Sequence, residues 1–295
     1  MNNQQMLEHI RSGQGFIAAL DQSGGSTPGA LKGYGIADDA YSTDEEMYAL
    51  IHAMRVRIIT SPCFGGGKVI GAILFERTMA GEADGQPIPE VLKARSVVPF
   101  LKVDKGLEDE ADGVKLMKPM PDLDALLDRG VAKGMFGTKM RSVIERASPS
   151  GISASVTQQF EVAEQISRKG LMPIIEPEVS IKAPDRDAAD RMLLAELIEA
   201  LDALSENRQV MLKLTLPAQA NLFAPLVDHP RVLRVVALSG GFSRAEACRQ
   251  LAENRGMIAS FSRALLSDLR VQMSDTEFDA TLGTAIDEIS AASVA

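Results

Sequence analysis

The chain has 295 residues, of which 45% are hydrophobic and 24% are charged, and its formal net charge is −9 at pH 7. This composition is typical of a globular protein with a sizeable core, and the acidic balance argues against a nucleic-acid partner. No apolar run reaches the ~18 residues of a membrane span, so we expect no membrane association.

Short apolar stretches that end in polar or charged residues alternate with helical segments along the chain. After a helical prelude at 1–14, strands are predicted at 15–22, 68–76, 97–104, 134–141, 171–178, 210–217, 232–241 and 256–264. Helices are predicted at 41–60, 121–133, 155–170, 186–206 and 243–254, with a C-terminal helix at 275–291. The alternation predicts an α/β fold, a (β/α)8 TIM barrel that spans residues 1–295 as one domain. A doubly wound open sheet is the alternative, and the match to eight strands favours the barrel.

Two of the predicted helices carry detailed signals. The segment 121–133 places Leu123, Leu126, Leu127 and Val131 at the spacing of one helical face. The segment 243–254 opens with Ser243 and has an acidic residue three positions later, which predicts a capping box. Both segments are therefore expected to pack as amphipathic helices.

Charged residues fall late in the predicted strands, where the chemistry of such barrels gathers. Three pairs have i, i+2 spacing, which puts both side chains of a pair on one face of a strand. A solvated strand end is the simpler interpretation of any single pair, but the whole set has both signs and can balance its own charge in a buried site. The late polar residues are Asp21, Glu76, Lys102, Asp104, Lys139, Arg141, Glu176, Glu178, Lys213, Ser239, Ser260 and Arg263.

Lys213 lies in the middle of the apolar stretch "VMLKLTLP" (210–217). Lysine is seldom buried without a partner, and burial beside another cation favours the neutral amine. A neutral amine can attack a ketone to form a Schiff base, and Glu176 and Glu178 on the preceding strand can supply the proton that the leaving hydroxyl needs. A lysine that extends past the strand to a salt bridge is the alternative. The presence of Lys139 and Glu176 on neighbouring strands favours the Schiff base.

Two Gly/Ser loops follow predicted strands. Ser239, Gly240 and Gly241 lead into a helix, so their backbone N–H groups can hold an anion, and Arg263 after the eighth strand can add a bidentate cation. The loop "QSGGS" (22–26) is a second, weaker candidate. An ordinary strand-to-helix turn is the alternative for each loop, but two anion sites suit a substrate with a phosphate at each end.

The cysteines and histidines give little sign of metal or disulfide chemistry. The two cysteines form no CxxC pair, and the first residues contain no apolar signal-peptide core, so we expect a cytoplasmic protein. The three histidines lie far apart in the sequence, and no catalytic metal site is expected.

Together these motifs resemble class I fructose-1,6-bisphosphate aldolase in its short bacterial form, over about residues 14–266. The matching motifs are "ALDQS", "GAILFERT", "KVDKG", "GTKMR", "PIIEPE", "LKLTLP", "LSGG" and "SFSRAL". The resemblance implies a catalytic set: Lys213 as the Schiff-base lysine, Glu176 as general acid/base with Glu178 beside it, Asp21 at the C4 hydroxyl, and Lys139 as the neighbouring cation. A second set would contact the substrate and its phosphates, namely Ser23, Ser26, Lys102, Arg141, Ser239, Gly240, Gly241, Ser260 and Arg263.

The implied activity is metal-independent, reversible cleavage of fructose 1,6-bisphosphate to dihydroxyacetone phosphate and glyceraldehyde 3-phosphate, as in glycolysis and gluconeogenesis. No cofactor is expected beyond the covalent Lys213–substrate Schiff base, the partner is a small phosphosugar, and a homo-oligomer is compatible with the sequence. An aldolase for another phosphorylated ketose, such as sedoheptulose bisphosphate or a ketose monophosphate, and a non-catalytic phosphosugar-binding barrel are the alternatives.

The sequence departs from the animal-type aldolases in two places. Their basic pair in the loop after the first strand is matched here only by Lys32. Their terminal tyrosine, which assists proton exchange on the enamine, is absent, because this chain ends "EISAASVA" and its tyrosines are Tyr34, Tyr41 and Tyr48. Another group is therefore expected to serve that proton step.

Overall fold

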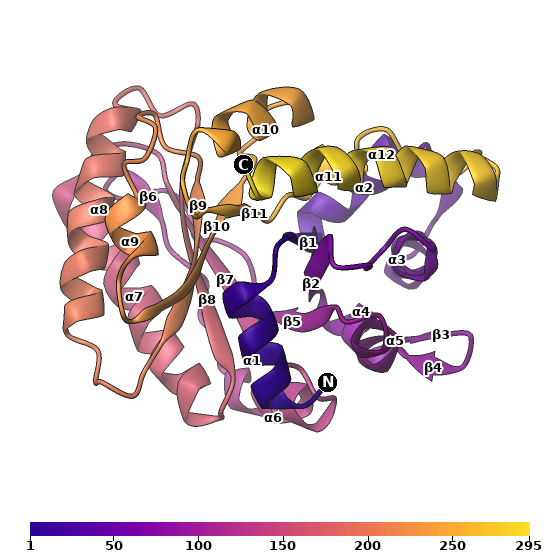
Figure 1. Cartoon of the computed structure of the whole chain (residues 1–295), viewed down its shortest axis with the longest axis horizontal. Helices are drawn as coiled ribbons and strands as arrows, with labels where there is room; N and C mark the ends of the chain where they lie inside the picture. The colour runs from indigo at the N-terminus through magenta and orange to yellow at the C-terminus, as the bar shows by residue number, and fades with distance from the viewer.

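The computed structural model describes all residues from 1 to 295, and eight parallel strands form its nearly closed barrel (Figure 1). The strands follow one another around the barrel in chain order. A doubly wound sheet would reverse direction at a switch point, so the order confirms the predicted TIM-barrel fold. The strands are β1 (Phe16–Leu20), β2 (Val69–Leu74), β5 (Val98–Lys102), β7 (Gly137–Ile144), β8 (Met172–Val179), β9 (Val210–Thr215), β10 (Val232–Leu238) and β11 (Ile258–Ala259).

The first and last strands meet at the seam of the barrel. β11 is only two residues long, and the Ala19 N–H donates to the Phe261 carbonyl at 3.1 Å just beyond it. Three short strands lie outside the parallel order. They are the hairpin of β3 (Glu82–Ala83) and β4 (Gln86–Pro87), and β6 (Val114–Lys115), which pairs antiparallel with β7.

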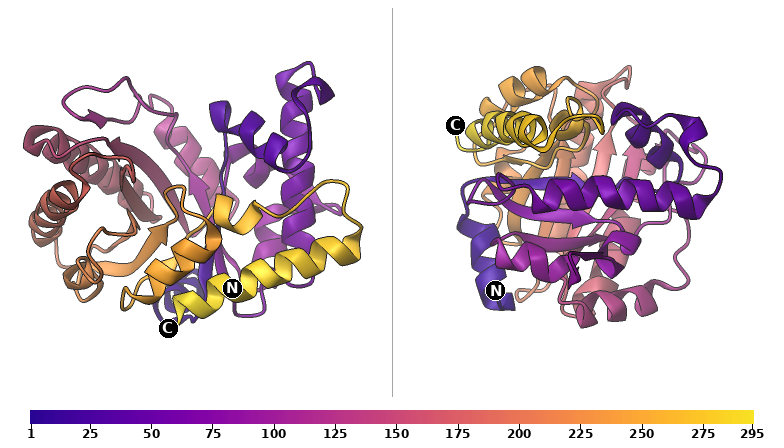
Figure 2. Two further views of the ribbon diagram at one scale, coloured as in Figure 1. Left: turned by 90° about the horizontal axis from the view of Figure 1, so that it is seen from above. Right: turned by 90° about the vertical axis from the view of Figure 1, so that its right-hand side faces the viewer.

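Helices surround the barrel, with α7 and α8 on one side and α3, α4, α5 and α12 on the other (Figures 1 and 2). No helix combines the length and the apolarity needed to cross a membrane. The helices are α1 (Asn3–Ser12), α2 (Thr27–Gly33), α3 (Asp44–Thr60), α4 (Glu76–Ala80), α5 (Ile88–Ala94), α6 (Leu123–Ala132), α7 (Pro149–Arg168), α8 (Arg186–Asp202), α9 (Ala224–Val227), α10 (Arg244–Ala252), α11 (Arg263–Leu266) and α12 (Asp275–Ser293), with 3-10 turns at Gly24–Ser26 and Asp38–Ala40.

The predicted prelude and C-terminal helix are both present, but several helical details differ from the prediction. Val131 is 48% exposed, because α6 buries only the leucine side of its predicted face. Ser243 accepts the N–H of Glu246 as expected. The Glu246 carboxylate, however, binds Arg249 instead of returning to Ser243, so the capping box is only half formed. The connection between β9 and β10 holds only the four-residue α9.

The barrel interior has an apolar lower layer that α1 closes from below. Met6 and Ile10 of α1 pack with inward-facing strand residues in one buried cluster. Because alternate residues of a strand share a face, the next inward position two residues later carries the charged groups. Four strands show this change from apolar to charged, at Ala19/Asp21, Phe100/Lys102, Ile174/Glu176 and Met211/Lys213.

Candidate active site

Four charged side chains from β1, β7, β8 and β9 meet above the apolar layer. The Lys213 Nζ lies 3.1 Å from Glu176 Oε1, and the Lys139 Nζ lies 2.7 Å from Glu176 Oε2. The same Lys139 Nζ lies 2.8 Å from Asp21 Oδ2. All four residues are buried, at 3% to 8% exposure. The cluster is thus a continuous row, Asp21–Lys139–Glu176–Lys213, with two positive and two negative groups.

The backbones of β8 and β9 pair only briefly, and this leaves room for the lysine. Their register contains Ile174–Met211 and Ile175–Leu212 and stops there. Pro177 has no N–H to donate to a ladder, and the strands are next joined where the Thr215 hydroxyl donates to the Val179 carbonyl at 2.7 Å. Between these points Glu176 and Lys213 meet through their side chains.

The charge states of Asp21 and Lys139 follow from their positions in the row. Burial alone would raise the pKa of Asp21, but attraction to Lys139 and Lys213 holds this pKa well below its usual range. Burial alone would lower the pKa of Lys139, but Asp21 and Glu176 raise it above its usual value. Asp21 is therefore a carboxylate and Lys139 an ammonium group at neutral pH.

A second ion pair lies beside the cluster, nearer to solvent. The Arg141 Nη1 donates to Glu178 Oε2 at 3.1 Å, and the Arg141 side chain is 43% exposed. Burial lowers the pKa of Arg141, but Glu178 and Glu176 together raise it above its usual value. The pair therefore lies at the rim of the cluster, with Arg141 partly open to solvent.

Lys102 is the one predicted substrate contact that folds back on its own strand end. Its Nζ donates to the Asp104 carboxylate at 2.7 Å and to the Asp104 carbonyl at 2.8 Å. The second Asp104 oxygen, Oδ2, is buried without a hydrogen-bond partner. No ion pair joins Lys102 or Asp104 to the row, but their charges act on Asp21 and Lys139.

The loop after β10 lies against Arg263, which follows β11. Gly240 and Gly241 have φ angles of +60° and +115°, in the left-handed region that favours glycine. A side chain on Gly241 would meet the Arg263 guanidinium at 3.3 Å, so the arginine lies directly against the loop. Ser239 and Ser260 are buried beside it, and the Ser260 hydroxyl has no partner.

The loop after β1 carries the other two predicted contacts. Ser23 and Ser26 bind each other, with the Ser23 N–H donating to the Ser26 hydroxyl at 3.0 Å. Just before them, Gln22 donates to the Ser262 hydroxyl at 2.5 Å and so ties this loop to the residue preceding Arg263. Lys32 lies exposed on α2 and forms no ion pair.

Two buried residues near the site, Arg55 and Gln159, were not predicted from the sequence. Arg55 of α3 is 1% exposed and donates to the Gln22 carbonyl and, at 2.8 Å, to the Thr78 hydroxyl. Burial lowers the pKa of Arg55 to about 10. Gln159 of α7 is fully buried behind Glu176, and a polar residue on the apolar side of a helix was the available signal.

Glu76, which was predicted to end the second strand, lies away from the row. It begins α4 and pairs with Arg129 at 2.5 Å.

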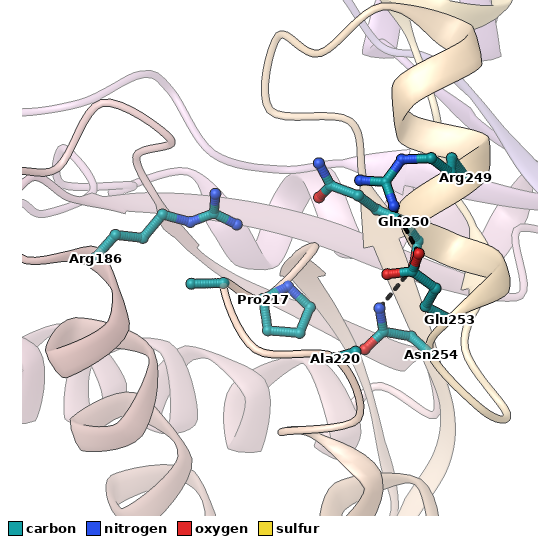
Figure 3. A pocket seen from close by; sticks show the side chains of 8 residues that line it. Arg186, Pro217, Ala220, Arg249, Gln250, Glu253 and Asn254 are labelled. Atoms are coloured by element: carbon teal, nitrogen blue, oxygen red, sulfur yellow. Dashed lines mark hydrogen bonds and ion pairs between the residues drawn. The ribbon is translucent and has the colours of Figure 1, made fainter.

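A cavity of about 150 Å³ lies at the surface beyond β9, but the row does not line it. Figure 3 shows Arg186 on one side of the cavity and Arg249, Gln250, Glu253 and Asn254 on the other. Arg249 is engaged by Glu246 and Glu253. No three His, Cys, Asp or Glu side chains in the structure are grouped so that they could hold a metal ion.

The barrel with a buried lysine–carboxylate row at the carboxyl ends of its strands has the architecture of an aldolase that works through a lysine. The chain belongs to the class I fructose-bisphosphate aldolase family, which it matches over residues 7–230. This match confirms the family expected from the motifs.

Two solved structures are similar to this chain in fold. One is a fructose-bisphosphate aldolase from Plasmodium falciparum in complex with TRAP and a small-molecule inhibitor, with a TM-score of 0.78 at 19% identity over 99% of this chain and 94% of that one. The other is an archaeal fructose-1,6-bisphosphate aldolase whose catalytic lysine is bound to the carbinolamine intermediate of the substrate. Its TM-score is 0.56 at 13% identity over 98% of this chain and 100% of that one.

Proposed function

We propose that this protein reversibly cleaves fructose 1,6-bisphosphate to dihydroxyacetone phosphate and glyceraldehyde 3-phosphate through a Schiff base on Lys213. The observation that carries the proposal is the buried row Asp21–Lys139–Glu176–Lys213. It offers a nucleophile, an acid and a base within contact of one another. The family match and the archaeal carbinolamine complex support the same chemistry.

The contacts of the two buried lysines favour Lys213 as the nucleophile. Lys139 lies between two carboxylates, and both stabilise its ammonium form. Lys213 contacts only one carboxylate, Glu176. A nucleophilic amine must lose its proton, and the two carboxylates beside Lys139 oppose that loss there.

Imine formation needs one acid and one base, and Glu176 can serve as both. The Lys213 nitrogen attacks the C2 carbonyl and gives a carbinolamine. Glu176 passes a proton from the nitrogen to the C2 oxygen, and it then delivers a second proton, taken up from bulk water, to the C2 hydroxyl, which leaves as water. The product is a protonated imine, whose positive charge withdraws electrons from the adjacent C3–C4 bond.

Asp21 is suited to the bond-breaking step, since the row keeps it ionised. The Asp21 carboxylate removes the proton from the C4 hydroxyl, the C4–O bond becomes a carbonyl, and the C3–C4 electron pair moves into the imine to give an enamine. The aldehyde phosphate then leaves. C3 of the enamine is protonated next, and water hydrolyses the imine to free Lys213. We assign the C3 proton to Glu176, the carboxyl group that contacts Lys213.

The phosphate next to the ketone is assigned to the cradle of Ser239, Gly240, Gly241 and Arg263. Backbone N–H groups at glycines in the left-handed region, with a guanidinium beside them, suit a phosphate dianion. The far phosphate is assigned to the loop of Ser23 and Ser26. We place the reaction in the cytoplasm, as a step of sugar-phosphate metabolism.

Reductive trapping tests the nucleophile. The protein is treated with borohydride in the presence of dihydroxyacetone phosphate, and the adduct is mapped by mass spectrometry. We expect a stable adduct on Lys213. Lys213→Met should keep the fold but lose the adduct and the cleavage activity. An active Lys213→Met variant, or activity abolished by EDTA, would contradict the mechanism.

Substrate comparison tests the ketose. Cleavage of fructose 1,6-bisphosphate is measured beside that of sedoheptulose 1,7-bisphosphate and fructose 1-phosphate. We expect the highest kcat/KM for fructose 1,6-bisphosphate. A higher value for another ketose would keep the Schiff-base mechanism and overturn this substrate assignment, while trapping without any cleavage would indicate a binding protein.

A further inference from the structure

Gln159 is a fully buried glutamine on α7 that reaches the backbone of the proposed acid/base residue. Its Oε1 accepts the N–H of Glu176 at 2.8 Å, and its Nε2 donates to the Ser142 hydroxyl at 2.6 Å. The Ser142 hydroxyl is also 2.7 Å from that of Ser155, one turn earlier on α7. Gln159, Ser142 and Ser155 all have 0% exposure.

The orientation of the Gln159 amide is fixed by these partners. A backbone N–H can only donate, so the amide oxygen must face Glu176 and the amide nitrogen must face Ser142. Ser155 and Gln159 are four residues apart on a helix and therefore share a face. The helix thus presents two polar groups at one point of an otherwise apolar packing surface.

The Gln159 link lies directly behind the charged row. Arg141 is the register partner of Glu176, and Ser142 is the partner of Pro177. Because neighbouring residues of a strand face opposite sides, Ser142 faces α7 while Arg141 faces the site. A single side chain therefore joins β7 and β8 at the level where both strands carry charged groups.

Glu176 is paired with β7 but has no strand partner on its β9 side. Its strand ceases to pair with β9 after Ile175, and the next residue is Pro177, which has no N–H. The Glu176 carboxylate must nevertheless contact two lysines at 2.7 Å and 3.1 Å. A shift of the Glu176 backbone by a fraction of an ångström would change both contacts.

We propose that Gln159 is a positioning residue for Glu176, holding its backbone so that the carboxylate is aligned for proton transfer at Lys213. The inference rests on the proposed Schiff-base function and adds to it a residue outside the substrate's reach. Gln159 moves no proton itself. It acts by fixing the position of the Glu176 backbone and the spacing between β7 and β8.

The same helix provides a matched control. Gln158 accepts the Met117 N–H at 2.9 Å and donates to the Met117 carbonyl at 2.9 Å, so it also makes two hydrogen bonds to other parts of the chain. It has no contact with Glu176. Gln158→Leu and Gln159→Leu therefore each remove two hydrogen bonds from α7, and only the second removes the link to the site.

The test compares imine formation in the unsubstituted protein and the two variants. With dihydroxyacetone phosphate, the rate at which the borohydride-trapped adduct forms on Lys213 is measured. KM for fructose 1,6-bisphosphate and the free energy of unfolding in urea are measured beside it. We expect Gln159→Leu to slow imine formation about 10- to 100-fold, as small misplacements of catalytic groups do, with KM changed by less than about 3-fold. Gln158→Leu should lose stability and keep the imine rate.

Ser142→Ala keeps the inference testable if Gln159→Leu does not fold. It removes the anchor of Gln159 on β7 but leaves the oxygen that accepts the Glu176 N–H, so we expect about a 3- to 10-fold slower imine. Imine rates in the Gln159 or Ser142 variants no lower than in Gln158→Leu would overturn the inference. No adduct in the unsubstituted protein would instead overturn the proposed function on which it rests.

Discussion

Replacing Lys139 by methionine tests whether the row stabilises the fold as well as the reaction. Methionine has a similar length and no charge, so the substitution leaves Asp21 and Glu176 buried beside an apolar side chain. In the native protein the Lys139 Nζ lies 2.8 Å from Asp21 and 2.7 Å from Glu176. Removing one partner of a buried ion pair costs about 3–5 kcal/mol, because the other charge is left uncompensated. We expect the free energy of unfolding to fall by about this amount.

The pH dependence of that loss gives a sharper signature. In the native protein the pKa of Asp21 is depressed, so its stabilising contribution is fully present above the ordinary Asp pKa of about 3.9 and is lost only as the pH falls further. Without Lys139, only Lys213 and Lys102 still offset the burial of Asp21, so the pKa of Asp21 rises. A buried carboxyl with a raised pKa favours the folded state at low pH. The deficit of Lys139→Met should therefore be smaller at pH 5 than at pH 8.

Urea unfolding followed by circular dichroism at the two pH values measures both effects. Lys68→Met is the matched control, because the Lys68 Nζ also lies 2.7 Å from a carboxylate, that of Asp287, but both side chains are more than half exposed. An exposed pair contributes about 0–1 kcal/mol. Equal losses in the Lys139 and Lys68 variants, or a Lys139 deficit that does not change with pH, would refute the reasoning.

Two further predictions concern a buried carboxyl group of α8 and the loop after β10. Burial raises the pKa of Asp190 to about 6, so the folded state loses stability as the pH rises from about 4 through 6. In urea unfolding, Asp190→Asn should therefore raise the free energy of unfolding by about 1–2 kcal/mol at pH 8 and by less at pH 5. A larger gain at pH 5 would contradict this. Gly240→Ala places a Cβ 2.6 Å from Ile181 Cγ2 and should raise KM for the bisphosphate about 10-fold or more. Gly85→Ala, also at positive φ but with nothing within 4 Å, should not change KM, and equal values in the two alanine variants would count against the phosphate cradle.

The strands and the charged row could be predicted because both depend on local pattern. An apolar run with a charged residue at an inward position, such as Met211 followed by Lys213, places that charge above the core of the barrel whatever the neighbouring strands contain. The opposite signs on consecutive strands then indicate contact. These signals require no knowledge of helix packing.

The supporting contacts could not be predicted, because each depends on where a helix lies. Gln159 was hidden within an amphipathic segment, and nothing in the sequence says that its amide meets the backbone of Glu176. Val131 has the spacing of the apolar face, but α6 is placed so that this residue faces solvent. Glu76 ends a strand-like run, yet the chain turns into α4 there and directs the carboxylate to Arg129.

The seam between β1 and β11 has a consequence for how the protein is made. Asp21 lies just after the first strand and Arg263 just after the last, and the Ala19–Phe261 hydrogen bond joins these ends of the barrel. Contacts between residues so far apart in sequence form late and slowly in folding. A ribosome must therefore release the chain to beyond residue 261 before this hydrogen bond can close the barrel. During synthesis, Lys213 leaves the ribosome before the barrel around it can be completed.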